Sequence, residues 1–349
     1  MINKFTLFFD YMLKRLKTIA LAMFLLLMAE IFTACNSSNG HRNEGRPPSE
    51  QLELLDAKIK KHPKDAELYY QRGTVLLGLK RVKPAIADFK KACELDQDEP
   101  RYFTALGDAY FSTGDAGESY KALERALQID PEDMEALLKM SEITFYSKDY
   151  DRAMETLNKV TRQDPNNKTA FFMKGFIYKE NGDTANAASY FRKLIDLYPD
   201  YAPAYEEMGV LYANHNNPKM AEEYLATAIK LDSTNTNAMY ALAMLYQDIG
   251  EAERANDVYV RILEIEPNNA YAWHNRGYLE MVYYHDFDAA IEFFTKAVDA
   301  NNQYVDAHVN RGMAYELKGD RKSAKECYET ALRIDPTSPK AKEGQARVR

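Results

Sequence analysis

Residues 168–201, KTAFFMKGFIYKENGDTANAASYFRKLIDLYPDY, and residues 202–235, APAYEEMGVLYANHNNPKMAEEYLATAIKLDSTN, decide the fold, because the second stretch repeats the first at a spacing of 34 residues. The eighth place of each stretch is glycine, Gly175 and Gly209, and the twentieth place of each is alanine. Each stretch also contains two runs with apolar residues three and four places apart, separated by a turn rich in Asn, Gly and Asp. The pattern therefore predicts two amphipathic helices in each stretch, helix A followed by helix B.

The same pattern extends along most of the chain. Aligned at this period, the sequence contains eight repeats, and the seventh is one residue longer than the others. The repeats begin at Ala66, Pro100, Met134, Lys168, Ala202, Thr236, Ala270 and Val305. The eighth places carry Gly73, Gly107, Ser141, Gly175, Gly209, Ala243, Gly277 and Gly312. The twentieth places carry Ala85, Ser119, Ala153, Ala187, Ala221, Ala255, Ala290 and Ala324. Because helices that cross closely need small side chains at the crossing, helix A and helix B of each repeat should pack together.

Large side chains and prolines complete the pattern. The twenty-fourth places carry Phe89, Leu123, Leu157, Phe191, Leu225, Tyr259, Phe294 and Tyr328. The second helix of five repeats is followed by proline, namely Pro131, Pro165, Pro199, Pro267 and Pro336. Proline cannot continue a helix, and the Asp and Asn residues beside it are good N-caps for the next helix A.

This 34-residue period, with its small and aromatic places in this order, resembles the tetratricopeptide repeat over residues 66–338. The resemblance implies an all-α, right-handed α-solenoid of eight helical hairpins at 66–99, 100–133, 134–167, 168–201, 202–235, 236–269, 270–304 and 305–338. The seventh repeat departs from the pattern, with a stretched turn around Tyr283 to Asp286. We expect this departure to change local regularity and not the fold.

Residues on either side of the repeats should bear on how the two ends of the repeat array are covered. Residues 49–65 contain an amphipathic helix that we expect to cap the first hairpin, because terminal repeats need a polar outer face. Residues 339–349 form a short polar tail interrupted by Gly344. The last hairpin should therefore stay partly exposed, or be covered by a partner or by self-association through the C-terminal repeat.

The N-terminus has the layout of a bacterial lipoprotein signal. Basic residues at 14–17 precede an apolar run from Ile19 to Phe32, which is too short for a permanent membrane span. Small residues before Cys35 resemble a lipobox, although Phe32 and Glu30 are unusual there. We expect a signal peptide at 1–34, for which Met12 is the better start, then a lipidated Cys35 and a flexible tether at 35–48. The expected location is the bacterial cell envelope, lipid-anchored to the outer membrane and facing the periplasm. The alternatives are a signal anchor and a soluble secreted form.

No pattern in the sequence indicates catalysis. It contains no Gly-rich phosphate loop, nucleophile elbow, Cys-x-x-Cys pair or His-Glu-x-x-His helix. His274 and His308 lie on neighbouring helices A, but no carboxylate or cysteine accompanies them at a ligand spacing. We therefore expect no enzyme activity, no cofactor and no metal site. Cys93 and Cys327 lie at opposite ends of the array and should be small buried hydrophobes.

The remaining candidate is a peptide-binding surface. In tetratricopeptide repeats the concave groove is lined by places 2, 5, 9, 12 and 13 of helix A. Here those places hold nine acidic and two basic residues, so the groove should favour basic or neutral segments. The candidate groove residues are Tyr70, Phe111, Phe145, Tyr146, Phe172, Phe176, Tyr240, Tyr271, His274, Asn275, Tyr278 and Asn310. Rigid rings bury area at little entropic cost, although we expect about half of the aromatics to pack against neighbouring hairpins instead.

These observations predict a non-catalytic scaffold for protein partners. The clamp of Lys and Asn with which family members capture acidic chaperone tails is absent, because no lysine stands at place 5. Asn275 and Asn310 at place 6 could instead hold a peptide backbone. The net charge of −8 argues against nucleic acid as a partner. A glycan- or small-molecule-binding lipoprotein is the alternative, since stacked aromatic rings also suit sugars.

Overall fold

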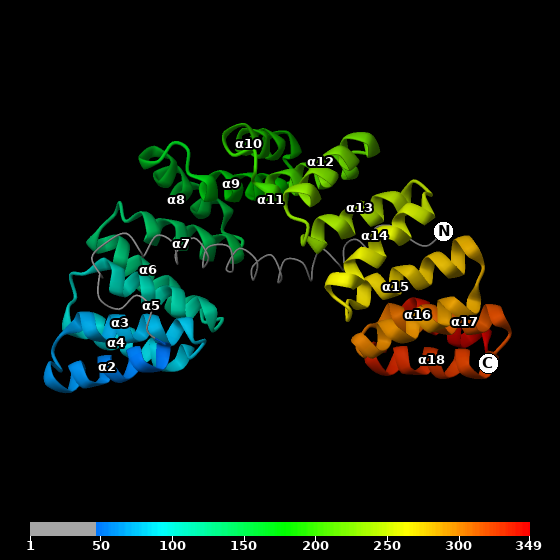
Figure 1. Ribbon diagram of the computed structural model, residues 1–349, viewed down its shortest axis with the longest axis horizontal. Helices are drawn as coiled ribbons and strands as arrows, with labels where there is room; N and C mark the ends of the chain where they lie inside the picture. Colours follow the sequence, from blue (N-terminus) through cyan, green and yellow to red (C-terminus); the bar gives the residue numbers. More distant parts are fainter. Residues whose placement is uncertain (1–46) are drawn as a thin grey trace. The chain divides into compact units, whose positions relative to one another are not determined.

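The computed structural model describes residues 47–349, and the regular elements within that range are all helices (Figure 1). The expected all-α architecture is therefore confirmed for this part of the chain. The predicted signal peptide at 1–34, the predicted lipidation site Cys35 and nearly all of the tether at 35–48 lie outside the described residues.

The chain divides into two compact parts after Lys139, inside helix α7 (Met134–Tyr146). In the N-terminal part each helix packs against the next, from α2 to α6. Its core includes Phe89, Cys93, Tyr102 and Leu106. Its helices are α2 (Pro48–Lys61), α3 (Ala66–Gly78), α4 (Val82–Leu95), α5 (Pro100–Ser112) and α6 (Ala116–Ile129).

The C-terminal part follows the same plan, with each helix from α8 to α19 packed against the next one along the chain. Its helices are α8 (Tyr150–Gln163), α9 (Lys168–Glu180), α10 (Thr184–Leu197), α11 (Ala202–Asn214), α12 (Pro218–Leu231), α13 (Thr236–Asp248), α14 (Ala252–Ile265), α15 (Ala270–Leu279), η1 (Glu280–Tyr284), α16 (Phe287–Ala300), α17 (Val305–Lys318), α18 (Arg321–Ile334) and α19 (Pro339–Arg347). The first residue of every sequence repeat is also the first residue of a helix.

The small residues at the eighth place let the two helices of a repeat touch. A Cβ atom added to Gly73 would lie 2.7 Å from the ring of Phe89, and one added to Gly209 would lie 2.6 Å from Cγ of Leu225. At the twentieth place Ser119, the only residue there that is not alanine, donates a hydrogen bond to the carbonyl oxygen of Gly107 at 2.7 Å. The large residue at the twenty-fourth place thus packs directly on the backbone of helix A.

The turn between helix A and helix B has one geometry in almost every repeat. A residue with positive φ ends the turn, for example Gly114 at 80° or Lys148 at 60°. The next backbone N–H then donates to a carbonyl five residues earlier, as Asp115 does to Tyr110 at 3.1 Å and Asp183 to Tyr178 at 2.8 Å. This bond satisfies a carbonyl that the end of helix A leaves without an intrahelical partner.

The seventh repeat accommodates its extra residue in a π-helix, η1, between α15 and the turn. The turn still ends in a positive-φ residue, His285 at 56°, but the N–H of Asp286 now donates to the carbonyl of Glu280, six residues earlier. The stretched turn predicted around Tyr283 to Asp286 is therefore one wide helical turn, which is the usual structural form of a single-residue insertion in a helix.

The C-terminal segment differs from the expected polar tail. Residues 339–347 form helix α19, which packs on α17 and α18 and begins one repeat length after Val305. Gly344 does not interrupt this helix. It lets α19 approach Tyr328, because an added Cβ would lie only 2.3 Å from Cε1 of that ring. The expectation of a partly exposed last hairpin is wrong, since α19 itself covers Tyr328, Ala331 and Val309.

The two cysteines in the described residues are both buried, as expected of small hydrophobes. Burial raises the pKa of the Cys93 thiol to about 12 and also raises the pKa of Cys327. Neither thiol is therefore activated as a nucleophile at neutral pH.

Candidate peptide-binding site

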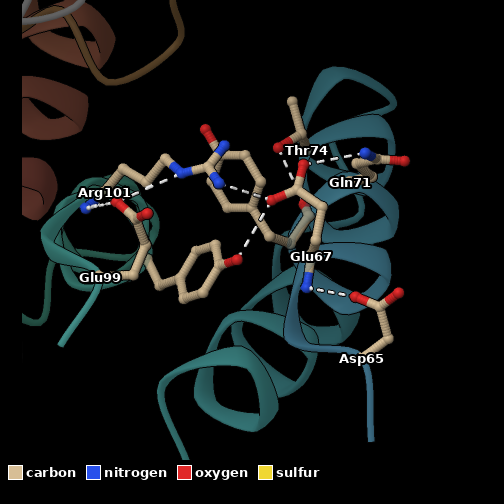
Figure 2. Close-up of polar contacts among 8 residues, drawn as sticks. Asp65, Glu67, Gln71, Thr74, Glu99 and Arg101 are labelled. Atoms are coloured by element: carbon tan, nitrogen blue, oxygen red, sulfur yellow. Dashed lines mark hydrogen bonds and ion pairs between the residues drawn. The ribbon is translucent and has the colours of Figure 1, made fainter. Parts of the chain in front are cut away.

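In the N-terminal part, side chains from α3 and α5 meet on the candidate groove face (Figure 2). The guanidinium of Arg101 on α5 lies 2.8 Å from a carboxylate oxygen of Glu67 on α3. It also lies 5.2 Å from the ring centres of both Tyr70 and Tyr102, whose rings are themselves 5.2 Å apart. The hydroxyl of Tyr102 donates to the same Glu67 carboxylate at 3.1 Å. The result is a triangle of two rings and one cation, in which Arg101 is also 3.3 Å from a carboxylate oxygen of Glu99.

Local sequence positions this group. Asp65 caps α3 by accepting a hydrogen bond from the N–H of Glu67, and Glu99 does the same for Arg101 at the start of α5 (Figure 2). Glu67 and Arg101 therefore occupy the second place of consecutive A helices. The side chain of Arg101 remains 45% exposed, so the cation is available to solvent although it is paired.

A buried ion pair lies on the same face of the N-terminal part. The ammonium of Lys139 is 2.5 Å from a carboxylate oxygen of Asp108, and the two side chains are only 4% and 11% exposed. A buried pair of this kind is costly to break, because removing one partner leaves the other charge uncompensated. Asp108, one of the acids assigned to the groove, is thus neutralised by Lys139.

In the C-terminal part, α9 contributes a packed ring cluster. The rings of Phe172 and Phe176 are 5.0 Å apart, and Phe172 is also 5.6 Å from Tyr201. Lys179 lies 4.2 Å from the centre of the Phe176 ring and 2.5 Å from the carboxylate of Glu207, which is almost fully buried. These two phenylalanines are therefore core residues and offer little surface to a ligand.

Farther along the C-terminal part, a polar network joins α13, α14, α15 and α17. The amide nitrogen of Asn275 donates to the hydroxyls of Tyr240 at 2.8 Å and Tyr259 at 3.0 Å. His274 lies between two amides, with Nδ1 3.1 Å from Oδ1 of Asn275 and Nε2 2.8 Å from Nδ2 of Asn310. Nδ1 therefore donates and Nε2 accepts, which requires the neutral imidazole.

The environment of His274 favours this neutral form. The side chain is fully buried, and burial lowers its pKa to about 4, although the carboxylate of Asp306 opposes this shift. The two asparagines of the network are also buried, at 2% and 8% exposure. Their amides bond to side chains inside the protein, so they are not arranged as an exposed ladder for a peptide backbone.

The candidate groove residues fall into two groups. Those with buried side chains are Phe145, Phe172, Phe176, Tyr240, His274, Asn275 and Asn310. Those left half-buried are Tyr70, Phe111, Tyr146, Tyr271 and Tyr278. The surface that a partner could contact is therefore carried by the second group.

Three acids of this face, Asp108, Asp306 and Glu316, are paired with cations that the sequence analysis did not place there. Helix α19 brings Lys340 to within 3.0 Å of Asp306 and Arg347 to within 2.8 Å of Glu316. The spacing of 34 residues between Glu67 and Arg101, and between Asp306 and Lys340, is the sequence signal that could have identified the Glu67–Arg101 and Asp306–Lys340 ion pairs. The groove places of helix A alone predict a strongly acidic face. The face of the folded protein is less acidic, because these ion pairs add positive charge to it.

Two other classes of site are not found in the part of the chain that the structure describes. Residues 47–349 contain no group of three or more His, Cys, Asp or Glu side chains positioned to hold a metal ion. Within the same range, each helix falls short of the length and apolarity that crossing a bilayer requires.

Family models match four segments of the chain. Residues 66–99, 215–275 and 305–338 match tetratricopeptide repeat models, and residues 100–205 match the tetratricopeptide domain of cytochrome c-type biogenesis protein H. This chain belongs to the tetratricopeptide repeat family. The expected α-solenoid and the resemblance drawn from the sequence are therefore confirmed. Members of this family typically act as scaffolds for protein partners.

Solved structures share the fold at low sequence identity. The APC/C hetero-tetramer Cut9–Hcn1 aligns with 85% of this chain at a TM-score of 0.55 and 17% identity, and this chain spans 58% of that one. A tetratricopeptide repeat protein from Parabacteroides merdae aligns with 72% of this chain and 98% of its own, at a TM-score of 0.54 and 16% identity. PilW, described as a widely conserved type IV pilus biogenesis factor, aligns with 60% of this chain and 97% of its own, at a TM-score of 0.54 and 18% identity. Among curated proteins, none matches the sequence of this chain.

Proposed function

We propose that this tetratricopeptide repeat protein is a non-catalytic adaptor that binds basic or neutral segments of partner proteins along its A helices. The observation that carries the proposal is the group formed by Tyr70, Arg101, Tyr102 and Glu67 on adjacent A helices. The half-buried Tyr70 ring and the charges of Arg101 and Glu67 remain accessible there, while the Tyr102 ring is buried. Such a face offers ring surface, a carboxylate acceptor and a guanidinium donor to an extended peptide.

Cross-linking in cells followed by mass spectrometry tests this proposal. Replacing Tyr70 and Phe111, two half-buried groove residues, with serine should remove one or more partners from the cross-linked set. Leu197→Ser is the matched control, because Leu197 is a 38% exposed apolar residue on a B helix, away from the groove places. An unchanged set of partners in the Tyr70→Ser/Phe111→Ser variant would contradict the proposal.

We further propose that the protein works at the bacterial cell envelope, held at the outer membrane by lipid on Cys35. The support is the sequence alone: a basic and apolar leader, small residues before Cys35, and a polar segment after it. A role beside an envelope assembly would parallel that of PilW, which shares the fold and is a pilus biogenesis factor.

The mass of the mature N-terminus tests the anchor directly. The expected result is an acylated peptide beginning at Cys35, recovered from the membrane fraction, and loss of membrane association in Cys35→Ala. More than one acyl chain is expected, because a single chain holds a protein at a membrane only marginally. A mature protein that begins elsewhere, or a soluble protein with an unmodified Cys35, would refute this location.

A further inference from the structure

The seventh repeat carries a surface that the regular repeats lack. Helix η1 projects two consecutive rings, with Tyr283 38% and Tyr284 44% exposed, beside Val282 at 38%. The hydroxyl of Tyr283 donates to the backbone carbonyl of Gln247 at 3.0 Å, which fixes η1 against the end of α13. The π-turn is thus a defined structure, since both its backbone and one of its rings are bonded.

Three carboxylates lie close enough to Tyr284 to act on it electrostatically. Partial burial and the negative charges of Glu253, Glu280 and Asp257 raise the pKa of the Tyr284 hydroxyl. Glu253 and Asp257 are exposed and lie on α14, four residues apart and therefore on one face of that helix. Two exposed rings and three carboxylates from two elements thus border the same patch.

Two cations of α14 and α17 are held by partners outside this patch. Arg254 bonds to Glu222 and Glu251 and stacks 3.9 Å from the centre of the Tyr246 ring. Lys318 is paired with Asp288. Arg276 is half-buried, with its guanidinium 4.2 Å from the centre of the Phe293 ring, and its charge offsets part of that of Glu280, so the uncompensated carboxylates are those of Glu253 and Asp257. The patch therefore combines exposed ring faces with negative charge, which is the environment that attracts a guanidinium or an ammonium group.

We propose that η1 and the adjoining face of α14 form a second docking surface, which binds an arginine- or lysine-containing segment of a partner protein. The cation of that segment stacks on Tyr283 or Tyr284 and pairs with Glu253, Asp257 or Glu280. This surface lies at the turn between the two helices of the seventh repeat, and the bond from Tyr283 to Gln247, at place 12 of α13, sets it at the border of the A-helix face proposed above.

Fluorescence anisotropy with a defined probe tests this surface on the full-length protein. The probe is a fluorescein-labelled Gly-Ser-Arg repeat peptide, and its counterpart has glutamine in place of arginine. We expect the arginine peptide alone to bind, and Tyr283→Ser/Tyr284→Ser to weaken it by about tenfold, the loss of two exposed cation–π contacts. A photo-cross-linking version of the peptide should attach to residues 280–286 or 253–257.

Two further variants make the outcome decisive. Glu253→Gln/Asp257→Asn leaves the rings and the π-turn in place and should also weaken the arginine peptide several-fold. Leu79→Ser is the matched control, because Leu79 is 40% exposed after the first helix of the first repeat, and it should leave binding unchanged. Equal binding of the two peptides, unchanged affinity in both patch variants, or cross-links confined to the A-helix face would each overturn the proposal.

Discussion

At the scale of single residues, glycine at the eighth place decides whether the two helices of a repeat can touch. In Gly209→Val, the new Cβ would overlap Leu225, whose Cγ is only 2.6 Å from the ideal Cβ position. Overpacking of this kind costs about 1–3 kcal/mol, so we expect a lower midpoint in urea unfolding. Gly78→Ala is the opposing control: nothing lies within 4 Å of its added Cβ, and alanine should stabilise helix α3 by up to about 1 kcal/mol. Equal midpoints for the two variants would contradict this account of the glycine pattern.

A single buried histidine should give the C-terminal part a pH dependence. The pKa of His274 is about 4 in the fold, against an ordinary value of 6.5, so the unfolded chain binds a proton more readily. Its contribution to stability is therefore complete above pH 6.5 and is lost as the pH falls toward 4, by on the order of 3 kcal/mol. Asp306 and Lys340 are the charged groups that also act on the ring.

The comparison with His274→Gln isolates this effect from the titration of carboxylates in the same range. Thermal unfolding of both proteins between about pH 7 and pH 4.5 should show a steeper loss in the native sequence than in the variant. Parallel curves would mean that His274 titrates normally in the fold.

At the scale of elements, the sequence predicts the helices better than the irregular features between them. The starts of the repeats coincide with helix starts because proline, Asp and Asn caps and small crossing residues recur at fixed places. The extra residue of the seventh repeat is visible in the sequence, but its conversion into a π-helix depends on which carbonyl the turn engages. Sequence patterns could not predict the burial of His274, Asn275 and Asn310 either, because each is polar and forms hydrogen bonds with a neighbouring repeat.

Helix α19 was missed for a related reason. Its residues are mostly polar, and its glycine would ordinarily break a helix, but here glycine is the one residue that fits against Tyr328. Truncation after Ser338 should uncover Tyr328 and remove the bonds from Arg347 to Glu316, lowering stability by at least about 2 kcal/mol. Thermal unfolding measures this loss. Lys342→Ala/Glu343→Ala, which changes two exposed residues of the same helix, should have almost no effect. A truncated protein as stable as the full chain would show that α19 is dispensable.

At the scale of the whole molecule, stability should be distributed along the chain and not pooled in one core. Each helix contacts mainly the helices next to it in sequence, both in the N-terminal part and in the C-terminal part. In arrays of this kind stability is approximately a sum of repeat and nearest-neighbour terms, and regions open separately. A substitution that destabilises one repeat should therefore lower stability mainly in that repeat and its neighbours.

Hydrogen exchange read by mass spectrometry can show this locality with one pair of matched variants. Gly312→Val places a Cβ 2.9 Å from the Tyr328 ring, and Gly107→Val places one 2.7 Å from Cγ of Leu123. The two substitutions are chemically the same but lie in different parts of the chain. Gly312→Val should therefore speed exchange in α17, α18 and α19 while α3 to α6 keep their protection. Gly107→Val should speed exchange in α3 to α6 while α17, α18 and α19 keep theirs. Faster exchange throughout the chain in either variant would mean that the repeats unfold as one cooperative body, and the docking surfaces proposed above could not then be altered independently.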